Sequence, residues 1–402
     1  MTEHFVCLTL EKPLRTGTLK PRGDYLDTRD YLPGSVLRGA LAEWLKLQGR
    51  ESQIVPTVQR VRFGNFFPSP AESIWALPFP MTALECKFHG GFRRIPQKTK
   101  TETLEKPGHG IRDSLLIALA YNELERHGAH LPVPMLLRCT HETNGRKCGG
   151  RMERVVGFYA AQPEGWQTVK VDKALQTKVA LSRHRRAAQE KMLYRVIGVR
   201  PKGCFVGRLW TEDEAVLEEL REAVEQVGVG ALTTRGFGAA RLKETKPRLD
   251  FIEERLRTFN EKLGEVWRDL AVLARQVNSS VPDASSGTYF SVDLLAPTIL
   301  RDPQGLPTLK LFLDFNGHVL EPVFWATQPT FVGGFSTAWG LLKPTYLGAA
   351  MGSVYVFRTE APQEELLPFL EDLEVRGVGF RTDEGLGEIL ICHPFHKEVM
   401  PV

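Results

Sequence analysis

Two glycine-rich segments that repeat each other constrain the fold of this chain more than any other feature of the sequence. Residues 228–242 read GVGALTTRGFGAARL and residues 377–391 read GVGFRTDEGLGEILI, and the two align without a gap. Every glycine of the second copy coincides with a glycine of the first, as do a valine and a threonine. Each copy follows a strand-like segment and an amphipathic helical segment. The sequence therefore predicts a strand–helix–loop–strand unit that occurs twice.

The same duplication divides the chain into two domains. The strand-like HFVCLTLEKP near the start of the sequence is echoed by YFSVDLLAP, and 402 residues suffice for two cores. Between the two lies NSSVPDASSG at 278–287, which has the Ser, Asn, Pro and Gly content of a linker. A first strand, inserted material and the repeated ending fit the split βαβ plan. We therefore predict an α+β fold of two tandem ferredoxin-like domains with insertions, residues 1–277 and 288–402.

The glycine loops lack the features of two common nucleotide-binding motifs. Neither has the Gly-Lys-Ser/Thr of a Walker loop, and both lead from a helix into a strand, the reverse of a dinucleotide fingerprint. A cradle for an RNA backbone and a purely structural turn remain. In the first copy Arg235 offers a phosphate contact and Phe237 an aromatic face, which favours RNA. The RNA-binding prediction covers Gly228, Gly230, Arg235, Gly236, Phe237 and Gly238.

The second glycine loop differs from the first in charge. It has Asp383 and Glu384 where the first copy has Thr234 and Arg235. Because carboxylates repel phosphate, we expect this loop to be structural or to face a protein.

Residues 178–195, KVALSRHRRAAQEKMLYR, form a basic segment. Such a cluster can neutralise several phosphates, although most charge runs are solvated faces. Because four basic-type residues follow one another with no acid among them, we favour RNA binding. The residues predicted to contact RNA are Lys178, Arg183, His184, Arg185, Arg186 and Lys191.

Near the start of the chain, Pro33-Gly34-Ser35 predicts a turn and cap before an amphipathic helix. Ser35 and Arg38 lie in the first turn, where backbone amides and a guanidinium could share one phosphate. A simple capped helix fits the same spacing equally well.

An acidic loop precedes that helix. Asp24, Asp27 and Asp30 could bind Mg²⁺ or promote attack by a ribose 2′-hydroxyl, so a metal-dependent ribonuclease is an alternative function. Loop aspartates are far more often turn formers.

Three of the six cysteines lie in polar surroundings that suit a structural metal. Cys139 and Cys148 bracket a polar stretch, and Cys86 lies in LECKFHG. Zinc takes four ligands, so His89, His109 or His141 would have to supply the fourth. The alternative is a set of unlinked thiols. Cys7, Cys204 and Cys392 lie in apolar, strand-like segments and are expected in the core.

Other functional classes find little support. The net charge is only +4, so RNA binding must depend on a local basic surface. No apolar run is long enough to cross a bilayer, and the first residues do not have the layout of a signal peptide. Neither GxSxG nor HExxH occurs, and no nucleophile partners His393 or His396 in the sequence. A metal-independent ribonuclease would need a histidine such as His184.

Taken together, the motifs resemble the RAMP superfamily of CRISPR-Cas systems. The resemblance is carried by YLPGSVLRGALA at 31–42, VRFGNFFPS at 61–69 and the first glycine loop. TFVGGFSTAWGLLKPTYLGAAMGSVYVF at 330–357 looks like the second domain of the two-domain RAMP subunit of type III-D complexes. HGIRD at 109–113 and the cysteine pair fit that subunit too, with His109 as fourth zinc ligand beside Cys86, Cys139 and Cys148.

The resemblance implies a cytoplasmic, non-catalytic subunit that holds the 5′ handle of the CRISPR RNA (crRNA). Its partners would be the large polymerase/nuclease-like subunit and the RAMP backbone subunits. The handle would meet the first glycine loop and the basic segment, with Ser35 and Arg38 nearby. Cleaving backbone subunits of the family carry an aspartate in the loop before the Pro-Gly-Ser helix, where this chain has three, so RNA cleavage remains the alternative.

Overall fold

The structure is a computed structural model in which the two predicted domains each form a four-stranded antiparallel sheet. It describes residues 1–17, 25–95, 107–129, 131, 137–181, 184–185, 188–277, 281–282, 286–336 and 340–402, with the backbone alone at 189–191. Among these residues no helix is both long enough and apolar enough to span a membrane.

The first sheet has the strand order β15-β1-β14-β3. Its elements are β1 (Thr2–Leu10), α1 (Gly34–Leu47), β3 (Arg62–Ser69), β14 (Cys204–Thr211), α5 (Glu214–Val227) and β15 (Ala240–Glu244). Each strand pair is antiparallel. Helices α1 and α5 bury leucines and valines against one face of the sheet. This is the ferredoxin-like plan, with β3 and β14 separated by a long insertion.

The second sheet repeats the plan with the order β21-β24-β16-β25. It contains β16 (Thr288–Leu294), β21 (Phe324–Ala326), β24 (Val354–Thr359), α7 (Gln363–Arg376) and β25 (Ile389–Ile391). Between β16 and β21 the chain forms two short hairpins, β17–β18 (Leu300–Arg301, Pro307–Thr308) and β19–β20 (Leu313–Phe315, His318–Leu320). The predicted α+β fold with two ferredoxin-like units is therefore confirmed.

Two helices that precede the predicted linker complete the second core. Helices α4 (Leu115–Arg126) and α6 (Ile252–Arg275) pack their apolar faces against β16, β24 and α7. Leu119 and Trp267, for example, share one buried cluster with Phe290. The boundary at 278–287 thus separates the two sheets in sequence. The second hydrophobic core, however, contains residues that precede this boundary as well as residues that follow it. This packing could not be read from the sequence, because both helices lie far from β24 along the chain.

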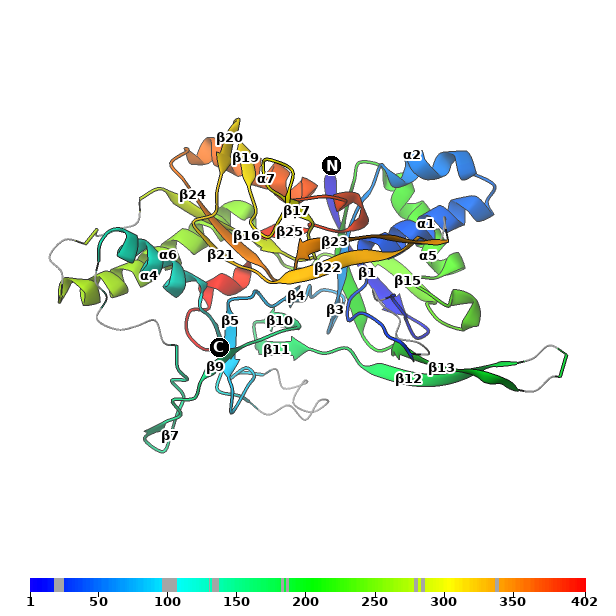
Figure 1. Ribbon diagram of the computed structural model, residues 1–402, viewed down its shortest axis with the longest axis horizontal. Helices are drawn as coiled ribbons and strands as arrows, with labels where there is room; N and C mark the ends of the chain where they lie inside the picture. Colours follow the sequence, from blue (N-terminus) through cyan, green and yellow to red (C-terminus); the bar gives the residue numbers. More distant parts are fainter. Residues whose placement is uncertain are drawn as a thin grey trace.

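The insertions carry the remaining sheets. They are β2-β13-β12 (Tyr25–Leu26, Ala188–Val199, Lys173–Leu181), β4-β10-β11 (Leu77–Pro78, Phe158–Gln162, Gly165–Val169), β6-β5-β9 (Ile111–Asp113, Ala83–Cys86, Met152–Arg154), β7-β8 (Glu142–Thr143, Arg146–Lys147) and β22-β23 (Pro329–Ser336, Leu341–Ala349). A short helix, α2 (Ile54–Val58), follows α1. Figure 1 shows the β12–β13 hairpin extending past β1 and β15, well apart from the β5 and β7 region.

A buried ion network fastens the two sheets to each other. Arg208 of β14 is fully buried, and its guanidinium pairs with Glu374 of α7 at 3.1 Å and with Glu388 at 3.2 Å. The ring of Trp75 and the ring of Trp210 lie 4.6 Å and 4.9 Å from the same guanidinium. Because the charges satisfy one another out of water, removal of a single partner would be costly.

Candidate nucleic-acid interface and metal centre

The structure brings the basic segment and the first glycine loop together. Strands β12 and β13 pair so that Lys178 lies opposite Tyr194. The Lys178 ammonium donates to the backbone oxygen of Arg235 at 3.2 Å, and the Arg235 guanidinium donates to the Tyr194 hydroxyl at 3.0 Å. Two regions that were predicted separately therefore form one surface, which we call the hairpin–loop surface: Lys178, Tyr194 and Arg235.

Several backbone amides of the first loop already donate hydrogen bonds within the fold. Val229 N–H donates to the Gly238 oxygen, Gly238 N–H to Pro13 and Ala231 N–H to Arg15, each at 2.8 Å. The glycines allow this close packing, since a Cβ on Gly238 would lie 2.1 Å from the Val229 oxygen. Of the amides in the predicted cradle, those of Gly228, Gly236 and Gly238 thus donate within the fold, to the backbone oxygens of Val224, Thr233 and Pro13.

Phe237 also differs from its predicted role. Its side chain is only 2% exposed, and the Lys178 ammonium lies 4.6 Å from the centre of its ring. The ring packs close to Gly198, where a Cβ would be 2.8 Å from it. Phe237 thus anchors the loop to the hairpin, and a base cannot stack on it in this conformation. Arg235, by contrast, is exposed.

The tip of the hairpin lies largely outside the described residues. Arg183 and Arg186 are among the residues that are not described, and the side chain of Lys191 is not described either. His184 and Arg185 are exposed in the turn. Arg195, opposite Thr177, adds a further exposed cation on β13.

The acidic loop borders the same hairpin, because β2 pairs in parallel with β13. Asp27 accepts the backbone N–H of Thr28 at 2.7 Å, and a carboxylate oxygen of Asp30 lies 2.5 Å from the Lys173 ammonium. Asp24 is outside the described residues. The two described aspartates therefore form a turn and an ion pair, as loop aspartates commonly do.

Arg38 pairs with acids of the second glycine loop, a contact that competes with the predicted phosphate contact. Its guanidinium lies 3.0 Å from Asp383 and 3.6 Å from Glu384. Helix α1 begins at Gly34, and its N-cap residue is Pro33. No side chain caps the helix, so the cap that was predicted around Ser35 is not formed. The second loop thus packs on the first domain, consistent with the structural alternative.

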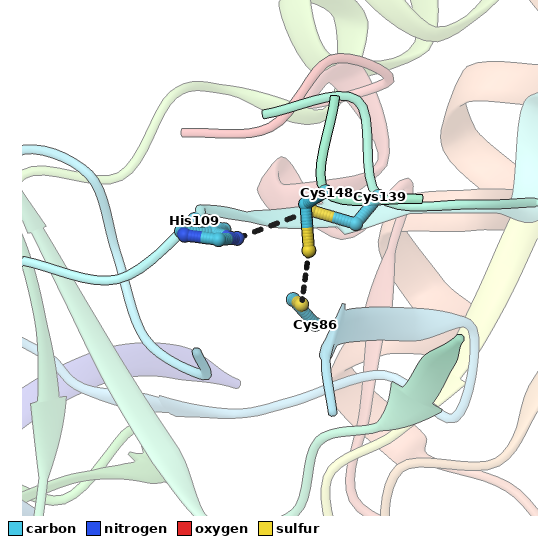
Figure 2. Close-up of side chains that lie close together, drawn as sticks. All are labelled: Cys86, His109, Cys139 and Cys148. Carbon is cyan, nitrogen blue, oxygen red and sulfur yellow. Dashed lines mark hydrogen bonds between the residues drawn. The ribbon is translucent and has the colours of Figure 1, made fainter. Parts of the chain in front are cut away.

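The cysteine–histidine cluster assembles from three separate stretches of chain (Figure 2). The ligand atoms of Cys86, His109, Cys139 and Cys148 all lie within 4.8 Å of one another. The sulfurs of Cys86 and Cys148 are 3.8 Å apart, and Cys139 Sγ is 3.4 Å from His109 Nδ1. Three thiols and one imidazole at this spacing match a tetrahedral Cys₃His zinc site.

Burial affects the ionisation of two members of the cluster. It raises the pKa of Cys139 to about 11, which opposes loss of the thiol proton, and a bound cation would offset this by stabilising the thiolate. Burial, together with the neighbouring His141 and His89, lowers the pKa of His109, which keeps its imidazole neutral. The His109 and His141 rings stack with their centroids 3.9 Å apart, and the His89 ring is tilted against that of His109, with centroids 4.3 Å apart. Of the three candidate histidines, His109 is the one grouped with the sulfurs.

The remaining cysteines are buried core residues, as predicted. Cys7, Cys204 and Cys392 are at most 6% exposed. Sequence reasoning missed Tyr194, which orients Arg235, and the acidic partners of His396. Neither had a local signal, because Tyr194 lies in a strand of mixed polarity and the acids lie far away in sequence.

Family comparisons match both halves of the chain. The model of the RAMP superfamily matches residues 7–241, and the model of the CRISPR-associated protein family Cas_Cmr3 matches residues 161–394. No curated protein matches the sequence.

The solved structures that match this chain have low sequence identity to it and low TM-scores. One is a chain of the Type III-B Cmr-beta complex bound to cognate target RNA and AMPPnP (11% identity, TM-score 0.36, covering 92% of this chain and 88% of that one). Another is the product of a Cas6-related gene from Pyrococcus furiosus (8% identity, TM-score 0.32, covering 98% and 100%). At these scores neither carries an argument about function.

Proposed function

Because the chain belongs to the RAMP superfamily and to its CRISPR-associated family Cas_Cmr3, we propose that it is an RNA-binding subunit of a type III CRISPR effector complex. The observation that carries the proposal is the hairpin–loop surface, where Lys178, Tyr194 and Arg235 are joined by hydrogen bonds. A guanidinium held by a phenol hydroxyl is well placed to bind a phosphate oxygen.

The RNA proposed for this surface is the 5′ handle of the crRNA. The basic hairpin and the exposed Arg235 would neutralise its phosphates. The partners would be the large polymerase/nuclease-like subunit and the RAMP backbone subunits, as in a cytoplasmic complex of the type III-B or type III-D kind. A net charge of only +4 suits a subunit whose RNA affinity is completed by its neighbours.

We further propose that the subunit does not cleave RNA. Support comes from Asp27 and Asp30, whose carboxylates are engaged by Thr28 and Lys173. A metal-dependent nuclease would need such carboxylates free to hold Mg²⁺. With the described aspartates committed to the fold, binding without turnover is the simpler function.

Zinc is proposed for the cluster of Cys86, His109, Cys139 and Cys148, in a structural role. All four positions of a tetrahedral ion would be filled by protein atoms, which leaves no site for substrate. The purified chain should hold about one zinc per molecule, and Cys148→Ser should lower that content.

The function is tested with labelled repeat-derived RNA, incubated with the purified protein with and without Mg²⁺. Shifted and cleaved species are resolved on the same gel and the salt dependence is recorded. Arg235→Ala should weaken binding and flatten the slope of log affinity against log salt by about 0.7, the value of one phosphate contact on a single strand. Arg257→Ala, an exposed arginine of α6, is the matched control and should bind as the wild type does.

Three outcomes separate the alternatives. Binding of intact RNA that depends on Arg235 supports the handle-binding subunit. Mg²⁺-dependent cleavage that disappears in Asp30→Ala or Asp27→Ala would establish the nuclease instead. Equal loss of affinity in Arg235→Ala and Arg257→Ala would remove the hairpin–loop surface as the binding site.

A further inference from the structure

The last residues of the sequence cross from the second domain onto strand β6 of the first-domain insertion. Ile111 N–H donates to the Val402 oxygen at 3.2 Å, and Val402 N–H donates to the Ile111 oxygen at 2.9 Å. Arg93 N–H also reaches the Val402 oxygen, at 3.1 Å, and Asp113 N–H donates to Glu398 at 2.8 Å. Residues 394–402, which we call the tail segment, are thus held along β6 by main-chain hydrogen bonds.

Side chains reinforce this docking. His396 is 1% exposed and lies between two carboxylates, Asp113 of β6 and Asp293 of β16, with Nε2 at 2.8 Å from Asp293. Phe395 is fully buried, and its ring centroid lies 5.0 Å from that of Tyr159. Gly110 has a φ of +99°, and a Cβ there would lie 2.6 Å from Pro401. The tail segment therefore fits closely to the insertion.

The same short stretch, HGIRD at 109–113, also contributes to the candidate metal centre. His109 is a member of the cluster, and its backbone oxygen accepts the Arg93 side chain at 2.8 Å. Arg112 is 6% exposed and donates to the backbone oxygen of Arg138, the residue before Cys139, at 2.9 Å. Within five consecutive residues, His109 thus belongs to the cluster, while Ile111 and Asp113 hold the tail segment.

We propose that the metal ion controls the docking of the tail segment, and with it how firmly the second domain is fastened to the first. The inference depends on the metal site proposed above. The cluster draws its ligands from three stretches of chain, which a metal would hold in one place. Metal binding and local folding are coupled in such sites, so loss of the ion releases the strand to which the tail segment is bound.

The proposal is tested by hydrogen exchange and mass spectrometry on the full chain, zinc-loaded and after removal of zinc by a chelator. Amides in peptides covering 109–113 and 394–402 should exchange about tenfold faster or more without zinc, because local opening becomes easier. The peptide covering 214–227, in α5, should not change. Cys148→Ser, which alters a half-exposed ligand, should reproduce the fast exchange in the presence of zinc. Cys204→Ser, a buried thiol outside the cluster, should not.

Linkage supplies a second readout that does not rely on a cysteine variant. If zinc stabilises the docked tail segment, docking must raise zinc affinity by the same factor. Deletion of residues 400–402, which removes the Val402 hydrogen bonds, should therefore weaken zinc binding measured by competition with a chelating dye.

The outcomes are distinct. Unchanged exchange at 394–402 after zinc removal, or an unchanged zinc affinity after the deletion, would overturn the proposal even if the chain holds one zinc. A wild-type protein that binds no zinc would overturn both the metal site and this inference. RNA binding, assayed on the same zinc-loaded and zinc-free samples, reports separately on the proposed function.

Discussion

The two glycine loops have the same backbone design but different surroundings. Each loop closes on the residues that follow the first strand of its own domain: Gly238 N–H donates to Pro13 in the first loop, and Gly387 N–H donates to Pro297 in the second. A Cβ on either glycine would collide with a backbone oxygen within its own loop. The glycines therefore preserve one turn geometry in both copies, and they do not by themselves define a binding site.

The side chains between the glycines decide what each loop contacts. The first loop presents Arg235 beside the β12–β13 hairpin, where it remains exposed. The second presents Asp383 and Glu384 to Arg38 of α1, and the backbone oxygen of Gly385 accepts the Asn65 side chain at 2.6 Å. One copy thus exposes a cation, whereas the other uses its acids to join the domains. Duplication of a motif carries over its shape and leaves its chemistry free to diverge.

The largest expected effect concerns the residue after the last glycine, which is Ala239 in the first loop and Glu388 in the second. Glu388 is fully buried, and its carboxylate accepts from the backbone N–H of Asn65 at 2.7 Å and from the Arg208 guanidinium at 3.2 Å. Glu388→Ala should lower the free energy of unfolding by about 3 kcal/mol, because a buried guanidinium loses a partner. Urea denaturation measures this. Asp383→Ala, an exposed acid of the same loop, should cost less than about 1 kcal/mol. Equal costs for the two variants would mean that the buried network does not join the domains.

A reciprocal charge exchange should separate the roles of the loops. Glu384→Arg would place a cation among Arg381, Lys343 and Arg38, so we expect a loss of about 2 kcal/mol in the free energy of unfolding. Arg235→Glu lies on the surface and should change stability by about 0.5 kcal/mol or less while abolishing RNA binding. Urea denaturation and RNA titration of both variants test the contrast. Tighter RNA binding by a stably folded Glu384→Arg protein would instead place RNA at the second loop, because the new guanidinium would attract phosphate.

Much of the fold followed from local periodicity. The amphipathic helical segments predicted before the two glycine loops are α5 (Glu214–Val227) and α7 (Gln363–Arg376). An amphipathic stripe and a following glycine mark the extent of each helix. The strand–helix–loop–strand units were predictable for the same reason. The packing of α4 and α6 on the second sheet was not, because an apolar stripe does not specify which sheet will cover it.

The candidate sites show the same limit. Residue type pointed to Cys86, Cys139 and Cys148 but left three histidines open; only the family resemblance favoured His109, which the fold groups with the sulfurs. The amide cradle predicted for the first loop was an inference from glycine spacing, and spacing does not reveal that amides such as those of Gly228 and Gly238 are already hydrogen-bonded. His396 has no acidic partner near it in sequence: Asp293 reaches it through the packing of the second domain, and Asp113 through the contact with the first-domain insertion.

The smallest effect is a pH dependence that belongs to the second loop alone. Burial disfavours the charge of Glu384, but hydrogen bonds from Arg381 and Lys343 outweigh it and lower the pKa of this carboxyl below its usual value. A group with a depressed folded pKa stabilises the protein above its unfolded pKa, about 4.3 for Glu, and loses that stabilisation as pH falls through the folded value.

Stability should therefore decline below about pH 4.3 by about 1 kcal/mol or less on account of this residue. The difference between wild type and Glu384→Gln, measured by urea denaturation from pH 7 downwards, should shrink over that range because the variant has no carboxylate to protonate. The first loop has Arg235 at the corresponding position, so Arg235→Gln should shift stability equally at every pH. A constant difference between wild type and Glu384→Gln would show that the second loop docks without the help of its charge, and the contrast between the loops would then lie in Glu388 alone.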